Sequence, residues 1–292
     1  MLDYHALKNW DFGETVQSYA ARDTMLYALG VGLGANPQDA IELRFVYEKE
    51  LRALPSFAAT LAWPGMWWSD PRTGVDWVKL VQGEQHVRLF RPLPVQATVV
   101  GRQCVESVTD KGPGRGAVAV VRRELFDSVT NEKLAEVRVV NVLRGDGGFS
   151  AACGVSDPGM AALPALPETP ADHTVDLATL PQSALTYRLS GDYNPLHADP
   201  EVARAAGFPR PILHGLATMG MAVHAVLKMC CDWDASRVQA LSVRFSAPVF
   251  PGETLRFEIW RDGAQRLRVR ASVAERSVVV LDRGVFELCR AS

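Results

Sequence analysis

The residues best suited to chemistry lie together near the start of the last third of the chain. The stretch Tyr-Arg-Leu-Ser-Gly-Asp-Tyr-Asn-Pro-Leu-His places a carboxylate (Asp192), a carboxamide (Asn194) and an imidazole (His197) within six residues. Gly191 can supply a positive φ, and Pro195 fixes its own φ and disfavours a helical conformation at Asn194. An Asp and a His that face one small volume can hold a water molecule and move its protons. The alternative is a turn beside a structural histidine.

A second cluster, Pro211-Ile-Leu-His214-Gly215, follows after a short interval. It precedes an apolar segment with helical spacing, so Gly215 would stand at a helix N-terminus. The unpaired backbone N–H groups of such a terminus can stabilise a developing oxyanion. A glycine selected only for close packing is the competing interpretation.

Helices and strands must position these clusters. Asp199-Pro200 followed by Gly207 predicts a short capped helix, and an apolar stripe predicts a longer one from about His214 to Met229. Alternating apolar and polar residues then predict the strands of an antiparallel sheet with one buried face. These strands cover 95–108, 117–126 and 134–143 in the first half and 241–245, 255–259 and 267–273 in the second. The fold class is therefore α+β.

The chain divides near its middle. Residues 145–172 are rich in glycine and proline, which predicts a linker over the surface. The segments Arg88-Leu-Phe-Arg-Pro and Arg244-Phe-Ser-Ala-Pro open similar strand-like stretches in the two halves, which indicates a duplication. We therefore expect an N-terminal half at 1–148, a linker at 149–172 and a C-terminal half at 173–292.

Composition excludes several classes of function. The 292 residues carry a net charge of −2, which gives no electrostatic case for a nucleic-acid partner. No apolar run is long enough to span a membrane. Six histidines without metal-ligand spacing predict no metal site. The five cysteines form no CxxC and read as reduced thiols, and no secretory signal is visible. The C-terminal Cys-Arg-Ala-Ser does not match a peroxisomal address. We therefore expect a cytoplasmic protein.

The two clusters resemble the signature of the MaoC-like (R)-specific enoyl-CoA hydratases, also called hydratase 2. The likeness extends to the first half through Tyr27-Ala-Leu-Gly-Val-Gly, Phe45-Val-Tyr-Glu, Leu54-Pro-Ser-Phe and Gly83-Glu-Gln. The resemblance implies a double hot-dog fold: two antiparallel sheets, each wrapped around a long helix. The first half lacks the Gly-Asp-x-Asn-Pro-x-His motif, so in this family it would be a degenerate half that accommodates the acyl tail.

The resemblance also implies roles for individual residues. Asp192 and His197 match the catalytic pair, Asn194 matches the residue that supports it, and Gly215 matches the oxyanion N–H donor. Glu48 matches an acidic residue of the first half that is implicated in activity, although a strand Glu is more often a surface or ion-pair residue.

Substrate contacts are expected elsewhere. Arg244 is a candidate for the CoA moiety, although its strand position equally suits a structural role, and Tyr187 and His214 are further substrate-binding candidates. Gln82 departs from the family, which has His before Gly-Glu-Gln. Three tryptophans of the first half suit either an acyl tunnel or ordinary packing; they are Trp63, Trp67 and Trp68.

The implied reaction is the hydration of a trans-2-enoyl-CoA to the (3R)-3-hydroxyacyl-CoA, which runs in reverse as a dehydration in fatty acid metabolism. No cofactor is expected, since CoA is part of the substrate, and the protein would be a monomer or a homodimer. One alternative is a specialised substrate: a branched or steroid side-chain acyl-CoA, or an acyl-carrier-protein thioester. The others are a hot-dog thioesterase and a non-catalytic acyl-thioester binding protein.

Overall fold

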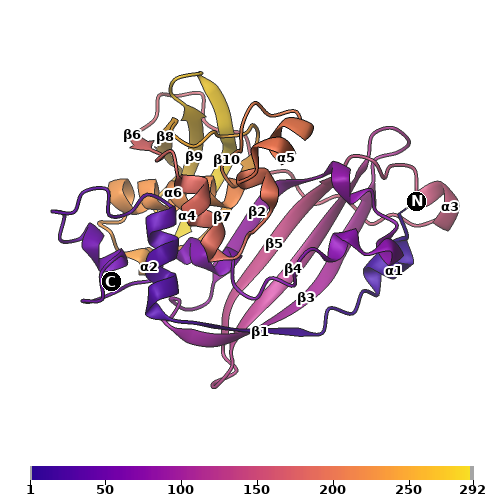
Figure 1. The fold of residues 1–292 in the computed structure, drawn as a ribbon, viewed down its shortest axis with the longest axis horizontal. Coiled ribbons are helices and arrows are strands. Elements are labelled where there is room, and N and C mark those ends of the chain that lie inside the picture. The colour runs from indigo at the N-terminus through magenta and orange to yellow at the C-terminus, as the bar shows by residue number, and fades with distance from the viewer. Residues whose placement is uncertain (1, 290–292) are drawn as a thin grey trace.

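The computed structural model describes residues 2–289, so the last three residues of the C-terminal sequence considered above lie outside it. Helices precede a run of consecutive strands in each half of the described chain, β2 to β5 in the first and β7 to β10 in the second (Figure 1). The strands are β1 (Glu14–Tyr19), β2 (Leu80–Leu89), β3 (Ala97–Asp110), β4 (Ala117–Asp127), β5 (Lys133–Leu143), β6 (His173–Ala178), β7 (Val238–Phe245), β8 (Thr254–Arg261), β9 (Arg266–Val273) and β10 (Val278–Leu288). The α-helices are α1 (Tyr4–Lys8), α2 (Ala21–Gly30), α3 (Ser150–Cys153), α4 (Ser183–Tyr187), α5 (Pro200–Ala205) and α6 (Gly215–Cys230). Within residues 2–289, none of these helices has the length and apolarity needed to cross a membrane.

All ten strands belong to one antiparallel sheet, in the order β1-β3-β4-β5-β2-β7-β10-β9-β8-β6. The predicted α+β class is confirmed, and the strands expected from alternation match β3, β4, β5, β7, β8 and β9 closely. The two expected sheets, however, are joined edge to edge, because β2 of the first half pairs with β7 of the second. At this seam Glu84 lies opposite Arg244 and His86 lies opposite Ser242.

Helix α6 is the long helix of the second half and begins and ends within one residue of the expected 214–229. Its residues are buried on almost every side, which explains why the apolar stripe in its sequence is so wide. The helix belongs to a core that draws on both halves, from Tyr27 and Phe57 to Val226 and Phe286. Helices α2, α4 and α6 lie near one another on the same side of the sheet (Figure 1).

The first half differs from the expectation of a second long helix. A short 3₁₀ helix, Pro55–Ala59, packs against α6 and against β2 and β5. Prolines and glycines explain its length: Pro55 suits the first turn of a helix, whereas Pro64 and Gly65 stop helix growth soon after it. The space above this part of the sheet is therefore only partly filled by a helix.

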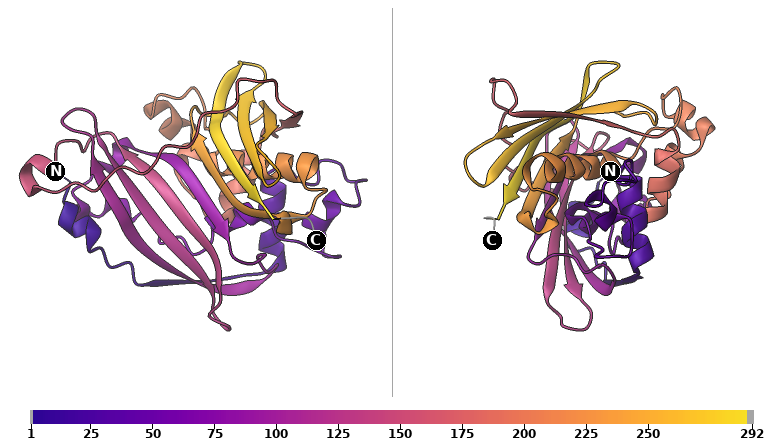
Figure 2. Two further views of the ribbon diagram at one scale, coloured as in Figure 1. Left: turned by 180° about the vertical axis from the view of Figure 1, so that it is seen from behind. Right: turned by 90° about the vertical axis from the view of Figure 1, so that its left-hand side faces the viewer.

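The segment between β5 and β6 crosses the face of the sheet that lies opposite the helices (Figure 2, left). It is held at several points by side chains of both halves. The hydroxyl of Tyr4 donates to Asp157 at 3.0 Å, and the indole N–H of Trp260 donates to the carbonyl of Thr169 at 2.7 Å. This proline-rich connection therefore follows a defined path over the sheet.

Candidate active site

The loop that carries the first cluster supports itself through short-range hydrogen bonds. Gly191 has a φ of +119°, a conformation that L side chains rarely adopt, and it ends the 3₁₀ turn Arg188–Ser190. The Asp192 carboxylate accepts from the Asn194 N–H at 3.1 Å, and the Asn194 side chain accepts from the Leu196 N–H at 3.0 Å. Asn194 thereby caps the 3₁₀ turn Pro195–His197 and fixes the direction of the imidazole.

His197 is held in one tautomer by a backbone carbonyl. Its Nδ1 lies 2.8 Å from the carbonyl oxygen of Ile212. Since a carbonyl can only accept, Nδ1 carries the proton and donates it, and Nε2 of the neutral ring is free to accept a proton. Burial lowers the pKa of His197, and the bond to Ile212 and the negative charge of Asp192 oppose that shift. The ring is therefore suited to act as a general base near neutral pH.

His214 packs directly against His197. The two rings are stacked with centroids 3.7 Å apart and planes inclined by 24°. His214 Nε2 donates to the backbone carbonyl of Asp192 at 3.1 Å, so this side chain ties the catalytic loop to the start of α6. Burial, and then the neighbouring His197, lower the pKa of His214 to about 4. It therefore stays neutral when His197 takes up a proton.

Tyr187 packs against the ring of His214. It is fully buried, and its ring centroid lies 4.9 Å from that of His214 and 5.8 Å from that of Tyr27. Burial raises the pKa of Tyr187 well above its usual value, so its hydroxyl remains protonated.

Gly215 is the first residue of α6, and its N–H belongs to the first turn, whose donors have no partner within the helix. A Cβ at this position would lie 3.2 Å from the ring of Phe245, so the glycine lets the helix start close to the end of β7. The helix N-terminus thus stands next to the loop with Asp192 and His197, where it can stabilise negative charge on a bound ligand.

Asp192, His197 and His214 form one compact cluster. One ligand atom from each side chain lies within 4.8 Å of the other two. Such a set could hold a metal ion, although His214 Nε2 is already engaged with the Asp192 carbonyl. The Asp192 carboxylate and the His197 imidazole are also close enough to bind one water molecule between them.

The cluster opens into a cleft of about 1230 Å³ that both halves line. Predicted site residues on its wall are Tyr187, Asp192, Asn194, His197, His214, Gly215 and Arg244. Arg244 is exposed on β7, with Glu84 and Asp282 at the paired positions of the two neighbouring strands. Trp63, Trp67 and Trp68 line the part of the cleft that belongs to the first half.

Glu48 is not brought to the cleft. It is an exposed residue in a loop after the 3₁₀ turn Glu42–Phe45, rather than a residue of a strand as expected. Gln82, the departure from the family pattern, does line the cleft, and its amide donates to Gln85 at 2.6 Å.

Phe245 and Arg123 are residues of the cleft that sequence reasoning did not single out as site residues. Phe245 ends a strand that the alternation of apolar and polar residues predicts. The sequence does not show that its ring packs on Gly215. Arg123 lies in the middle of β4, next to Arg122, and only the pleat of the strand shows which of these two arginines faces inward.

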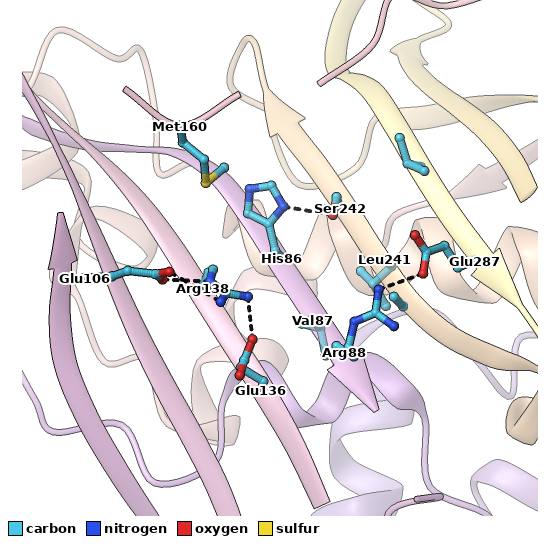
Figure 3. Close-up of a pocket in the computed structure, with 12 residues that line it drawn as sticks. His86, Val87, Arg88, Glu106, Glu136, Arg138, Met160, Leu241, Ser242 and Glu287 are labelled. Atoms are coloured by element: carbon cyan, nitrogen blue, oxygen red, sulfur yellow. Dashed lines mark hydrogen bonds and ion pairs between the residues drawn. The ribbon is translucent and has the colours of Figure 1, made fainter. Parts of the chain in front are cut away.

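A smaller hollow of about 360 Å³ lies on the opposite face of the sheet, across the seam (Figure 3). Its charged groups are paired with one another: Arg138 with Glu106 at 2.7 Å and with Glu136, and Arg88 with Glu287 at 2.7 Å. It contains none of the predicted site residues. Because its charged side chains already neutralise one another, they do not need a bound ligand as a counter-ion.

Comparison with known proteins identifies similar chains. A MaoC-like domain matches residues 163–282, and the MFE-2 hydratase 2 N-terminal domain matches residues 17–145. The chain is 38% identical to "Enoyl-CoA hydratase 2, peroxisomal" of Arabidopsis thaliana, over 92% of this chain and 90% of that protein.

Solved structures agree with these sequence matches. A MaoC-like dehydratase from Phytophthora capsici superimposes with a TM-score of 0.84 at 32% identity and covers 96% of both chains. A protein of Mycobacterium tuberculosis described as having a double hot-dog fold superimposes with a TM-score of 0.53 at 17% identity, covering 94% of each chain. This likeness supports the fold alone, and the double hot-dog architecture is confirmed.

Proposed function

Because this chain belongs to the MaoC-like hydratase 2 family, we propose that it is an (R)-specific 2-enoyl-CoA hydratase, a hydro-lyase. It adds water to a trans-2-enoyl-CoA and, in reverse, dehydrates a (3R)-3-hydroxyacyl-CoA. The observation that carries this proposal is the Asp192 and His197 pair beside the N-terminus of α6, inside a cleft that both halves line.

In the proposed mechanism His197 is the base. Its Nε2 takes a proton from water as the water oxygen bonds to C3, and the Asp192 carboxylate accepts a hydrogen bond from the same water. The C2–C3 electron pair moves toward the thioester, whose oxygen becomes negatively charged and accepts from the Gly215 N–H. The imidazolium then returns a proton to C2, which leaves neutral His197 and the 3-hydroxyacyl thioester.

Asp192 and Asn194 act on this base in different ways. The negative charge of Asp192 stabilises the imidazolium, in agreement with its upward contribution to the pKa of His197. Asn194 supports the loop by capping the turn that carries His197. Tyr187 and His214 hold the two parts of the site together, and Arg244 would meet the phosphates of CoA at the rim of the cleft. Glu48 would contribute only through a rearrangement of its loop.

No cofactor is proposed beyond the CoA that the substrate carries. We also expect the reaction to need no metal ion, although Asp192, His197 and His214 lie close enough to bind one. Treatment with EDTA followed by dialysis should leave the hydration rate unchanged.

A cytoplasmic location is proposed, whereas the Arabidopsis relative is named as peroxisomal. Whether the chain is a monomer or a homodimer stays a prediction for light scattering.

The first experiment follows the conjugated thioester of trans-2-enoyl-CoAs of several chain lengths, with free thiol and product stereochemistry measured in parallel. Loss of the conjugated thioester without free thiol, with the 3R alcohol as product, is the expected result. Release of free thiol would instead indicate a thioesterase. Binding without turnover across simple, branched and steroid side-chain substrates, and across carrier-protein thioesters, would favour a binding protein.

A further inference from the structure

One buried cation in the cleft has no role in the proposed reaction. Arg123 projects from β4 into the first half of the cleft and is only 3% exposed. Its Nη2 donates to the carbonyl of Ala59 at 2.7 Å, but its Nε is buried and has no hydrogen-bond partner within residues 2–289. Burial lowers the pKa of Arg123 to about 10, and no acidic group among residues 2–289 offsets that shift. A buried guanidinium without a counter-ion is costly, because charged groups are rarely removed from water unpaired.

Among the described residues, one other arginine is buried to a similar extent, and it is differently placed. Arg268 is 5% exposed, but Asp262 lies 3.9 Å from it, and it donates to the backbone carbonyls of Gly284 and Pro164. It does not line the cleft. Arg268 is therefore a structural arginine with its partners in place, whereas Arg123 combines a cleft position with an incomplete set of partners.

The neighbouring strand supplies a second polar group at the same place. Gln103 on β3 lies directly opposite Arg123 and also lines the cleft. Side chains at opposite positions of antiparallel strands share a face and have Cβ atoms about 5 Å apart. Gly101, on the same strand as Gln103, leaves room for the stem of Arg123, since a Cβ there would lie 2.7 Å from Ala62 and 3.5 Å from Arg123 Cδ. Guanidinium and amide N–H donors thus face one volume, a pairing suited to the two oxygens of a carboxylate.

The position of this pair identifies which part of a substrate would reach it. Strand β4 is separated by three strand steps from β7, whose last residue packs on Gly215. At about 4.8 Å per step, this separation is roughly 14 Å across the sheet. The thioester at Gly215 is therefore far from Arg123, whereas the tail of an acyl chain lying in the first half of the cleft would approach it.

We propose that Arg123 and Gln103 form a carboxylate-binding subsite, so that the preferred substrates are enoyl-CoA esters whose acyl tail ends in a carboxylate. This inference rests on the proposed hydratase activity and specifies the substrate class of the same site. The carboxylate supplies the missing counter-ion of Arg123, while Trp63, Trp67 and Trp68 contact the apolar part of the tail.

The test compares kcat/KM for pairs of trans-2-enoyl-CoAs of equal length, one ending in a methyl group and the other in a carboxylate, over a series of lengths. At the length that spans the cleft, the wild-type protein should prefer the carboxylate by at least about tenfold, since a site built for hydrogen bonding disfavours an analogue that lacks the group. Arg123→Met should reduce this ratio to about one. Arg123→Lys should retain part of it, because lysine keeps the charge but not the planar fork.

Arg268→Met is the matched control, because it also removes a buried guanidinium but lies outside the cleft. It should lower the melting temperature without changing the carboxylate preference. If Arg123→Met does not fold, Arg123→Lys and the milder Gln103→Leu decide the question through the same ratio.

Two results would overturn the subsite. One is a wild-type protein that hydrates methyl-ended substrates and shows no carboxylate preference at any length; the hydratase assignment would then stand alone. The other is an Arg123 variant that slows both members of each pair equally, which would make Arg123 purely structural. Failure to hydrate any enoyl thioester would instead refute the proposed function itself.

Discussion

At the scale of single residues, the tautomer of His197 decides which group can act as base. The sequence brings Asp192 and His197 together but leaves either residue as a possible base. The decisive contact is the Nδ1 hydrogen bond to the carbonyl of Ile212, fifteen residues further along the chain. It leaves Nε2 as the proton acceptor, and burial keeps the ring neutral near pH 7.

Substitutions of the catalytic pair should separate chemistry from folding. Asp192→Asn and His197→Gln keep similar shapes but remove the negative charge and the base. We expect kcat to fall by about 10²–10⁴-fold in each variant, the usual contribution of a positioned acid or base. Melting temperatures should change little, as measured by circular dichroism. Near-normal turnover in either variant would contradict the proposed mechanism.

The pH dependence of kcat/KM should report the titration of His197. The base is active when unprotonated, so activity falls as the pH drops below its pKa. Burial places that pKa below the ordinary value of 6.5, so the acidic limb should also lie below pH 6.5. A profile measured across this range in buffers of constant ionic strength provides the test. An acidic limb above pH 6.5 would show that another group controls the rate.

The residues predicted from sequence were those whose signal is local. Asp192, Asn194, His197 and Gly215 share two short motifs, and the structure places all four on the wall of one cleft. Arg123 was not identified because its significance depends on burial and on a missing partner, which are properties of distant packing. Glu48 illustrates the converse, since its motif is present but its side chain is exposed away from the cleft.

At the scale of elements, the position of α6 determines where the oxyanion donor stands. The helix contacts the loop before it through His214 and packs against the segment after α2 near Gly220. A Cβ on Gly220 would clash with a methyl group of Val31 and would lie 3.0 Å from the hydroxyl of Tyr27. The glycine therefore sets how closely α6 approaches the first half of the molecule.

Gly220→Ala should destabilise the protein by about 1–3 kcal/mol, the usual cost of overpacking a filled core. Although alanine favours the helix, its methyl group would displace Val31 or the helix itself. Urea unfolding measures the loss, and the added Val31→Ala substitution serves as the control, because it removes the clashing methyl groups. The double variant should be more stable than the sum of the single effects predicts. Strict additivity would show that the two residues do not compete for the same space.

The element boundaries were predictable where one periodicity dominates. Alternation with a period of two located most of β3, β4, β5, β7, β8 and β9, and the apolar stripe located α6. The 3₁₀ helix Pro55–Ala59 could not be anticipated, because it stands where the fold family implied a long helix. Its shortness leaves room for the cleft in the first half, so the departure from the expected element has a functional consequence.

At the scale of the whole molecule, the two halves share both a sheet and a core. The seam between β2 and β7 makes the sheet continuous, and one hydrophobic cluster includes Tyr27 and Phe57 of the first half with Val226 and Phe286 of the second. The repeated pattern in the sequence suggested two similar units but gave no sign of this joining. Edge pairing depends on the side-by-side arrangement of strands, which sequence periodicity does not encode.

This shared construction predicts that the protein unfolds in one cooperative transition, although it contains two repeats. Unfolding one half alone would expose the β2–β7 edge and the hydrophobic core that both halves share. We therefore expect neither half to stay folded when the other unfolds. Differential scanning calorimetry should give a single peak whose calorimetric and van 't Hoff enthalpies agree. In the wild-type protein Arg88 and Glu287 form an ion pair at 2.7 Å near the seam. As a control, Arg88→Glu replaces this pair with two like charges. The single peak should then shift to lower temperature without splitting. Two separated peaks would show that each half folds independently and that the seam adds little to stability.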